Sequence, residues 1–163
     1  MGDYYVATTG SDSNPGTSAQ PFRTIQKAAN IVNPGDTVIV RDGVYNQSNP
    51  DTFSYTLRLT RSGTINNWIT FRAENKWGAV LDGGNNAVDF GITAGTGLAY
   101  VRIEGFEIKG YKYGGIHLNQ PNIKYINIYN NRIHHIGNWS STYAGLDGID
   151  TFAGIAPDYT QPS

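Results

Sequence analysis

Alternating apolar and polar side chains run through most of the chain, and this pattern predicts short β-strands. The segment 100–108 recurs as 125–133, and the segment 115–118 recurs at a longer offset as 148–151. The later copy therefore holds extra residues, which we place between 137 and 145. A repeat of roughly 20–50 residues, built here from short strands with Gly or Asn corners, indicates a solenoid of stacked coils.

The same alternation extends toward the N-terminus. It predicts further strands at residues 4–7, 37–41, 55–59 and 68–72. Ile69 aligns with Val101, and Phe71 aligns with Ile103. Successive coils then begin their strands at Val38, Ile69, Val101 and Ile126. We expect the alternate aliphatic side chains to point inward and to stack from coil to coil.

One segment has helical rather than strand spacing. Five apolar residues form a single stripe at this spacing, namely Phe22, Ile25, Ala28, Ala29 and Val32. The sequence Asn33-Pro34-Gly35 ends the pattern, so we expect a helix over about 21–33. A solenoid exposes an apolar end and unpaired strand edges at its first coil. We therefore predict that this helix is an N-terminal cap.

Composition excludes several classes of protein. The formal net charge is -1 and charged residues make up 15% of the chain, so no basic field for nucleic acid is expected. There is no cysteine, which removes disulfides and thiolate metal sites from consideration. No apolar run approaches the length of roughly 18 residues that a spanning helix needs, so we expect no membrane span.

The N-terminal region resembles a known family. The resemblance rests on residues 4–12 (YYVATTGSD), 14–17 (NPGT), 21–29 (PFRTIQKAA), 34–38 (PGDTV) and 43–45 (GVY). This opening is similar to that of right-handed parallel β-helix proteins of the pectate-lyase type, in particular the family-9 polysaccharide lyases. The resemblance implies an all-β, right-handed parallel β-helix with a short N-terminal capping α-helix. We expect one domain over 1–163 with roughly five coils over about 37–153, as the N-terminal part of a longer β-helix.

The segment 145–150 (GLDGID) is similar to the acidic strand that binds catalytic Ca²⁺ in that family. Two carboxylates three residues apart, with Gly between them, can turn toward one hard cation. The resemblance therefore implies a Ca²⁺ site with Asp147 and Asp150 as ligands. The alternative is that Asp-Gly at a solenoid corner forms an ordinary turn.

The chain departs from the family pattern at two points. Leu146 stands where a further Asp leads the acidic cluster, and the preceding coil offers no carboxylate at the aligned positions His117, Asn119 and Asn122. The family's catalytic Lys lies on a strand beyond the cluster, but no Lys or Arg follows Asp150 here. We therefore assign no catalytic residue, and whether the chain is an enzyme stays open.

Aromatic and cationic side chains in turns and in the insertion supply candidates for binding a sugar. An exposed ring can stack on the apolar face of a sugar, and a cation can meet an acidic one. The alternatives are that the rings pack over their own loops and that the cations are ordinary solvated groups. The candidate substrate-binding residues are Trp139, Tyr143, Tyr111, Tyr113, Lys112, His117 and Arg132.

The pair His134-His135 is a further candidate for metal chemistry. Adjacent residues on a strand point to opposite faces, so we expect that these two side chains do not bind one metal together.

Two functions remain in competition at this point. The first is a secreted or cell-surface carbohydrate-active domain that binds an acidic polysaccharide and belongs to a Ca²⁺-dependent polysaccharide lyase-like protein. The second is a non-catalytic β-helix module of a cell-surface or adhesion protein, which binds glycans or spaces other domains. In either case an open last coil predicts self-association through that end or continuation of the β-helix.

Overall fold

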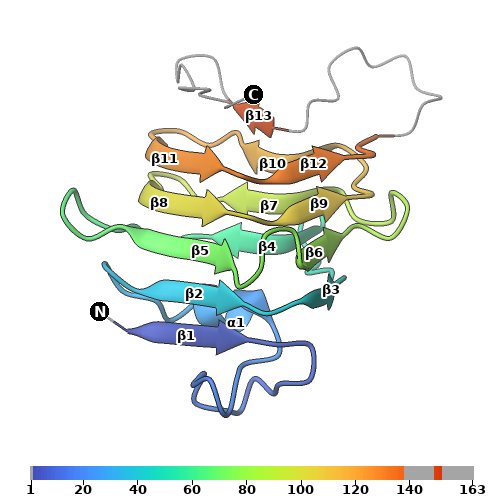
Figure 1. Cartoon of the computed structure of the whole chain (residues 1–163). Coiled ribbons are helices and arrows are strands. Elements are labelled where there is room, and N and C mark those ends of the chain that lie inside the picture. Colours follow the sequence, from blue (N-terminus) through green and yellow to red (C-terminus); the bar gives the residue numbers. More distant parts are fainter. Residues whose placement is uncertain (1, 138–148, 152–163) are drawn as a thin grey trace.

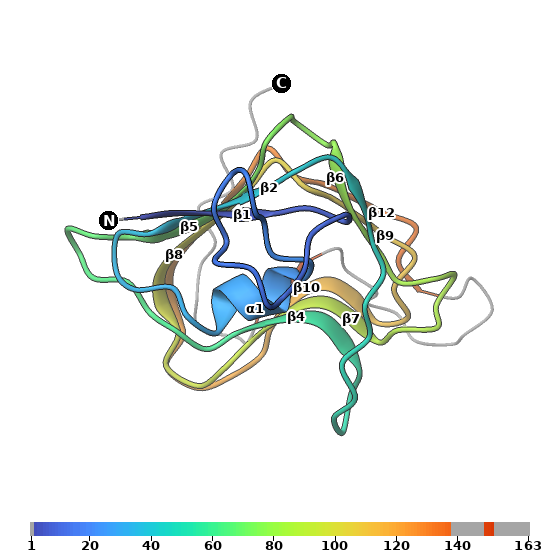
Figure 2. The same ribbon diagram turned by 90° about the horizontal axis from the view of Figure 1, so that it is seen from below.

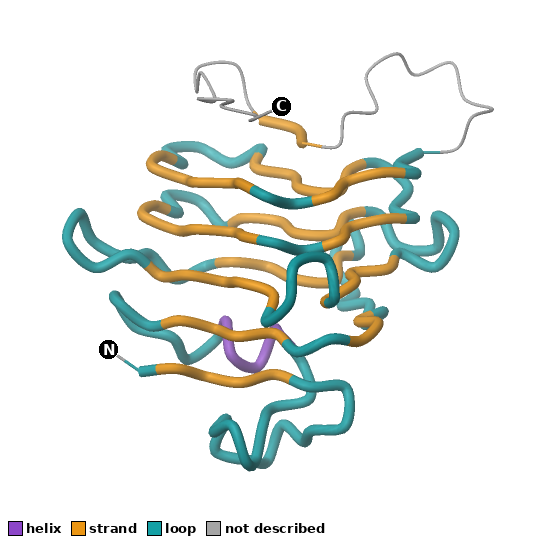
Figure 3. Tube along the Cα trace, viewed as in Figure 1, coloured by secondary structure: helices purple, strands orange, loops and turns teal. Residues whose placement is uncertain are grey.

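The computed structural model describes residues 2–137 and 149–151. The chain winds into a stack of coils, and successive coils add strands to three separate sheets (Figure 1). Figure 3 shows the same stack with strands on every level and one short helix near its N-terminal end. This confirms the prediction of an all-β solenoid with an N-terminal helix.

The three sheets each run along the stack. Sheet A contains β1 (Asp3–Val6), β2 (Thr37–Val40), β5 (Ile69–Ala73), β8 (Ala99–Glu104) and β11 (Lys124–Tyr129). Sheet B contains β3 (Gly43–Tyr45), β6 (Ala79–Asp82), β9 (Glu107–Lys109) and β12 (Arg132–His134). Sheet C contains β4 (Tyr55–Leu59), β7 (Phe90–Ala94), β10 (Gly114–Leu118) and β13 (Ile149–Thr151). Every pairing between these strands is parallel.

The register confirms most of the predicted alignment. Ile69 pairs with Val101 and Val101 pairs with Ile126, as the repeat requires. The longer offset also holds, because Ile116 pairs with Ile149. The first step has a different register, because Val38 pairs with Phe71, two positions beyond Ile69. A shift of two positions keeps the same side chains inward, so apolar alternation alone does not detect it.

The core is a set of aliphatic and aromatic columns along the axis. In sheet A, Val38, Phe71 and Ile103 stack on one another and each is at most 2% exposed. Sheet C contributes Leu57 and Ile92 in the same way. Burying one such side chain stabilises a fold by about 1.5–3 kcal/mol. The coils are thus held by apolar stacking inside and by backbone hydrogen bonds between neighbouring strands.

The helix is shorter than predicted. It covers Ile25–Ala29 (α1), with Thr24 as its N-cap accepting a hydrogen bond from the Lys27 backbone N–H at 3.1 Å. Phe22 lies outside the helix because its backbone pairs with that of Val6 in a parallel bridge. The apolar stripe is nevertheless correct, since its five members are all buried. The stripe predicted for one helix is thus formed by Phe22 before the helix, by the helix itself and by Val32 after it.

The helix closes the first coil, as predicted. Figure 2 shows α1 at the base of the stack beside β4, and α1 contacts β1, β2 and β4. The Gln26 side-chain amide donates to the Arg58 carbonyl at 3.0 Å and accepts from the Arg58 N–H at 2.8 Å. These two bonds take the place of the backbone hydrogen bonds that a neighbouring strand would form, so the N–H and carbonyl of Arg58 at the edge of β4 are both paired.

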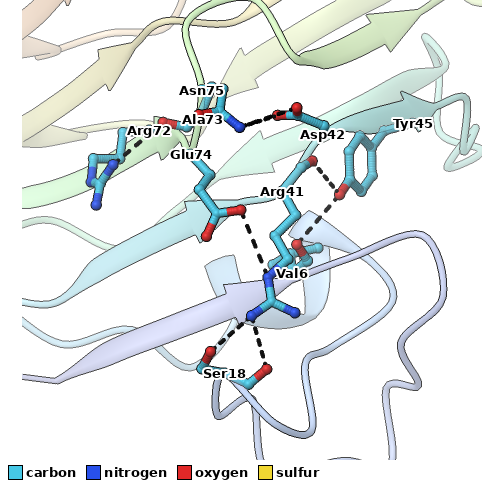
Figure 4. A network of polar contacts seen from close by, with 9 residues as sticks. All are labelled: Val6, Ser18, Arg41, Asp42, Tyr45, Arg72, Ala73, Glu74 and Asn75. Carbon is cyan, nitrogen blue, oxygen red and sulfur yellow. Dashed lines mark hydrogen bonds and ion pairs between the residues drawn. The ribbon is translucent and has the colours of Figure 1, made fainter.

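A polar network at the corner between sheets A and B ties the N-terminal segment to two coils (Figure 4). The Arg41 guanidinium donates to the carbonyl and the hydroxyl of Ser18 at 2.9 and 2.8 Å, and it lies 3.8 Å from the Glu74 carboxylate. Asn75 donates to both oxygens of Asp42. The Tyr45 hydroxyl, buried beneath them, donates to the Arg41 carbonyl at 2.9 Å.

No helix in the described part of the chain has the length and apolar character needed to cross a bilayer.

Burial of Tyr45 predicts a loss of stability at alkaline pH. Burial raises the pKa of Tyr45 to about 12, and the nearby Asp42 carboxylate adds to the shift. The unfolded chain releases this proton at about pH 10, so the folded state holds it more tightly. The protonated Tyr45 therefore adds to the free energy of unfolding. This stabilisation is complete below pH 10 and is lost between pH 10 and 12, at about 1.4 kcal/mol per pH unit. Tyr45→Phe removes this part of the slope.

Urea unfolding of Tyr45→Phe and wild type across this pH range measures the difference. Tyr125→Phe, which removes the same hydroxyl from a side chain that is 55% exposed, serves as the control. An identical slope for Tyr45→Phe and wild type would contradict the assignment.

The capping bonds of Gln26 predict a second effect on stability. Gln26→Ala leaves the N–H and the carbonyl of Arg58 without their partner at the edge of β4, which costs about 1–3 kcal/mol. Gln20 is exposed, so the matched Gln20→Ala changes the free energy of unfolding by less than about 0.5 kcal/mol. Chemical denaturation of both variants gives the comparison, and equal effects would rule out a capping role for the Gln26 amide.

Candidate carbohydrate-binding face

The outer face of sheet C carries a pocket of about 300 Å³. Its walls come from β4, β7 and β10 and from the loop 46–54 that precedes β4. The residues used below are Asp51, Phe53, Arg58, Phe90, Thr93 and His117. The pocket is therefore built by three successive coils together with one loop.

Strand register places one polar residue of each coil in a single column. Arg58 pairs with Thr93, Thr93 with His117, and His117 with Asp150. Neighbouring strands lie about 4.8 Å apart, so the column runs parallel to the axis of the stack. On β4, β7 and β10 the flanking aliphatic residues are buried in the core, which directs the side chains of the column outward.

Aromatic rings form one side of the pocket. Phe53, Phe90 and Tyr113 contact one another, with ring centroids 5.7–6.3 Å apart. The imidazole of His117 stacks on Phe90, with a centroid distance of 4.1 Å and an interplanar angle of 21°. Phe53 is 54% exposed and Tyr113 is 40% exposed. These two rings therefore present apolar surface at the protein exterior, where it can stack against a sugar.

The charged members of the pocket form an ion pair. Arg58 Nη1 lies 2.8 Å from Asp51 Oδ2, and the guanidinium stands 5.9 Å from the centre of the Tyr55 ring. Of the described residues that line the pocket, Arg58 alone carries a permanent positive charge. The loop is fixed next to it by Asp89, whose Oδ2 accepts from the N–H and the hydroxyl of Ser54 at 2.8 and 2.9 Å.

Three predicted substrate-binding residues meet in this region. His117 lines the pocket, and Tyr113 packs against its aromatic side. Lys112 is next to them, with its Nζ 4.8 Å from the centre of the Tyr113 ring. A hydrogen bond with Tyr113 raises the pKa of Lys112, so this ammonium keeps its positive charge.

Tyr111 does not belong to the surface, and its predicted contact with sugar is wrong. Its side chain is 0% exposed, and its hydroxyl hydrogen-bonds with the Thr56 hydroxyl at 2.8 Å. Burial raises the pKa of Tyr111 well above its usual range. The ring fits inside because Gly83 and Gly91 lack side chains, and a Cβ on either would come within 3.0 Å of it.

Arg132 lies away from this face. It belongs to β12 of sheet B, and its guanidinium stands 5.8 Å from the Trp77 ring centre. Trp77 in turn donates from Nε1 to the Asn130 carbonyl at 2.9 Å. The structure thus gives Arg132 a packing partner at a different corner of the solenoid and does not bring it to Tyr113 and His117.

The two adjacent histidines approach each other, against the expectation from strand alternation. His134 is the last residue of β12, and His135 has a φ of 53°, which turns its ring back so that the two Nδ1 atoms are in contact. Glu107 Oε1 lies 3.0 Å from His134 Nε2. Within residues 2–137 and 149–151, however, no group of three or more acidic, His or Cys side chains is placed to hold a metal ion.

The remaining candidates are two aromatic residues of the insertion and the two proposed Ca²⁺ ligands. Trp139, Tyr143 and Asp147 lie outside the described residues. Asp150 lies within β13, where its backbone pairs with that of His117. The Ca²⁺ site and the sugar contacts of the insertion therefore stay predictions.

Sequence reasoning missed Asp51, Phe53, Arg58, Phe90 and Thr93. A signal was present for Arg58, which stands between two leucines of the strand 55–59. Arg58 pairs with Thr93, and Thr93 pairs with His117, but the two pairs are separated by different numbers of residues. The longer loops between β4 and β7 cause this difference, so the alignment is not evident from the sequence.

Parallel coils around an aliphatic core with an N-terminal cap define a parallel β-helix, and the match to a family model makes it one of the pectate-lyase type. The chain belongs to the family described as "Pel9A-like, right handed beta helix region", which matches residues 4–145. The predicted family and the right-handed coil are thereby confirmed.

Similarity to individual proteins is partial. The chain is 40% identical over 83 residues to the uncharacterized protein YwoF of Bacillus subtilis (strain 168), covering 50% of this chain and 16% of YwoF. The solved structure of pectate lyase Pel9A has a TM-score of 0.64 and 23% identity, over 83% of this chain and 34% of that one. A rhamnogalacturonan lyase has a TM-score of 0.56 and 25% identity, over 78% and 34%. The chain thus spans about a third of the length of these lyases.

Proposed function

We propose that the chain is part of an extracellular carbohydrate-active protein and that the outer face of sheet C binds an acidic polysaccharide. The observation that carries the proposal is the pocket lined by both the exposed ring of Phe53 and the Arg58 guanidinium, with the exposed ring of Tyr113 packed against Phe53. The names of the two similar lyases, which refer to pectate and rhamnogalacturonan, support a polysaccharide as the ligand.

The pocket residues suit the separate parts of an acidic sugar. The apolar face of a sugar ring stacks on Phe53 or Tyr113, as carbohydrates do on aromatic side chains. The carboxylate pairs with Arg58, whose planar fork matches carboxylate geometry. Hydroxyl groups of the sugar exchange hydrogen bonds with Thr93 and His117. A pocket of about 300 Å³ is at the small end for ligand sites, so it takes a short part of a longer polymer.

Calcium at Asp147 and Asp150 remains part of this proposal. Calcium bound there would neutralise the carboxylate of a uronate sugar that lies along the face. The described residues hold no group of three or more acidic, His or Cys side chains placed for a metal ion, so this part of the proposal depends on Asp147 and on the side chain of Asp150. The register supports this location, because Asp150 adjoins His117 at the end of the polar column.

A binding module without catalysis is the second candidate. Proton abstraction next to a uronate carboxylate requires a base at the sugar. Among the described residues that line the pocket there is no Lys, the carboxylate of Asp51 is paired with Arg58, and the imidazole of His117 stacks on Phe90. In this second candidate the pocket binds and orients a sugar, and none of these groups abstracts a proton.

Binding should depend on the charge of Arg58. Isothermal calorimetry with an oligogalacturonate, compared with a neutral oligosaccharide of equal length, measures this dependence. Arg58→Gln should weaken binding of the acidic ligand by about tenfold, since it removes a charge-assisted pair. Arg102→Gln on sheet A makes the same change of charge on another face and should leave the affinity unchanged. No binding by wild type, or equal affinity for acidic and neutral ligands, would overturn the proposal.

Calcium binding is tested by calorimetry with CaCl₂ in the absence of sugar. Wild type should bind the ion at millimolar concentration or below, and Asp150→Asn should abolish the signal because a carboxylate ligand is lost. Asp3→Asn changes the same charge on the exposed start of β1 and should retain binding. Absence of heat from wild type at millimolar Ca²⁺ would remove Asp147 and Asp150 as ligands.

A further inference from the structure

The Arg58 guanidinium is the group in the pocket best suited to an acidic ligand, and it already forms an ion pair with Asp51. Arg58 Nη1 and Asp51 Oδ2 lie 2.8 Å apart, and their side chains are 38% and 46% exposed. A pair this open to water is weak, because the solvent stabilises both charges when they separate. The contact is therefore easily exchanged for another one.

The loop holds Asp51 in this position from both sides. Asn49 and Tyr55 pair their backbones in an antiparallel bridge, with N–H to carbonyl distances of 2.8 and 3.2 Å. Asp51 Oδ1 accepts from the Thr52 N–H at 2.8 Å, which leaves Oδ2 for Arg58. The carboxylate is thus presented to the guanidinium from the tip of a short hairpin that also carries Phe53 to the aromatic side of the pocket.

A uronate offers the same chemical group as Asp51. Both are planar carboxylates with one negative charge, and a guanidinium binds such a group through a fork of parallel N–H donors. An acidic sugar stacked on Phe53 brings its carboxylate into the pocket that Asp51 and Arg58 also line. It then meets Arg58 already paired and Asp51 as a like charge.

We propose that Asp51 is a specificity-determining residue whose carboxylate holds the place of the ligand carboxylate on Arg58. Binding of an acidic sugar exchanges one carboxylate for the other, and the hairpin tip releases Arg58. A neutral sugar leaves the Asp51–Arg58 pair intact. Asp51 therefore lowers the affinity for every acidic ligand. An acidic ligand binds tightly only if its other contacts with the pocket outweigh this loss. This inference rests on the proposed function, because it assigns the acidic ligand to the same pocket.

Asp51→Asn keeps the size of the side chain and removes the competing charge. Calorimetry with the oligogalacturonate and with the neutral oligosaccharide is carried out on wild type, Asp51→Asn and Asp3→Asn. Asp51→Asn should bind the acidic ligand about fivefold more tightly, the size expected for breaking an exposed ion pair. Its affinity for the neutral ligand should not change. Asp3→Asn controls for the altered net charge and should match wild type.

The double variant Asp51→Asn/Arg58→Gln identifies the partner. It should gain less over Arg58→Gln than Asp51→Asn gains over wild type, because no guanidinium remains to be released and only the like-charge repulsion is removed. If wild type binds the acidic ligand but Asp51→Asn binds it equally or more weakly, the inference is wrong and the proposed function stands. Equal tightening for the neutral ligand would also overturn it, since that would show simple opening of the pocket. If no variant binds the acidic ligand, both proposals fail.

Discussion

In-register stacking of parallel coils is the constraint on which the rest of the structure depends. Each strand exchanges backbone hydrogen bonds with the strand one coil away, and the period of two then decides which side chains enter the core. Val38, Phe71 and Ile103 fill one such inner column. The first coil has no coil below β4, and Gln26 replaces the missing strand there with its side-chain amide. The helical cap is therefore a direct consequence of the stacking.

The same constraint builds the pocket. When the flanking aliphatic residues of β4, β7 and β10 are fixed inward, Arg58, Thr93 and His117 must line up outside. No one coil contains a site, because each contributes a single polar residue to the column. The loop 46–54 completes the arrangement by bringing an aromatic ring and a carboxylate over the column. A rigid stack with variable loops can thus acquire a ligand site without a change in its core.

The sequence predicted those features that repeat and missed those that depend on a single loop or turn. Pairing of Val101 with Ile126 was predictable because both strands and the corner between them recur at a fixed offset. Inward packing of Tyr111 was not, since it depends on space left by glycines of other coils. The ring of His135 was placed wrongly because a positive φ ends the alternation. The position of Arg58 was not predicted, because the loops between β4 and β7 make the sequence separation between Arg58 and its partner Thr93 irregular. The face of sheet C was thus only partly foreseen, through Tyr113 and His117.

The central claim is that one flank of the solenoid, defined by coil register, receives the sugar. The most direct measurement is the change in backbone amide chemical shifts of the ¹⁵N-labelled chain during titration with an acidic oligosaccharide. The account predicts that the perturbed amides cluster on the outer column of sheet C and on the loop 46–54, with sheets A and B unaffected. Perturbations centred on sheet A or sheet B, with the column of Arg58, Thr93 and His117 unchanged, would contradict it.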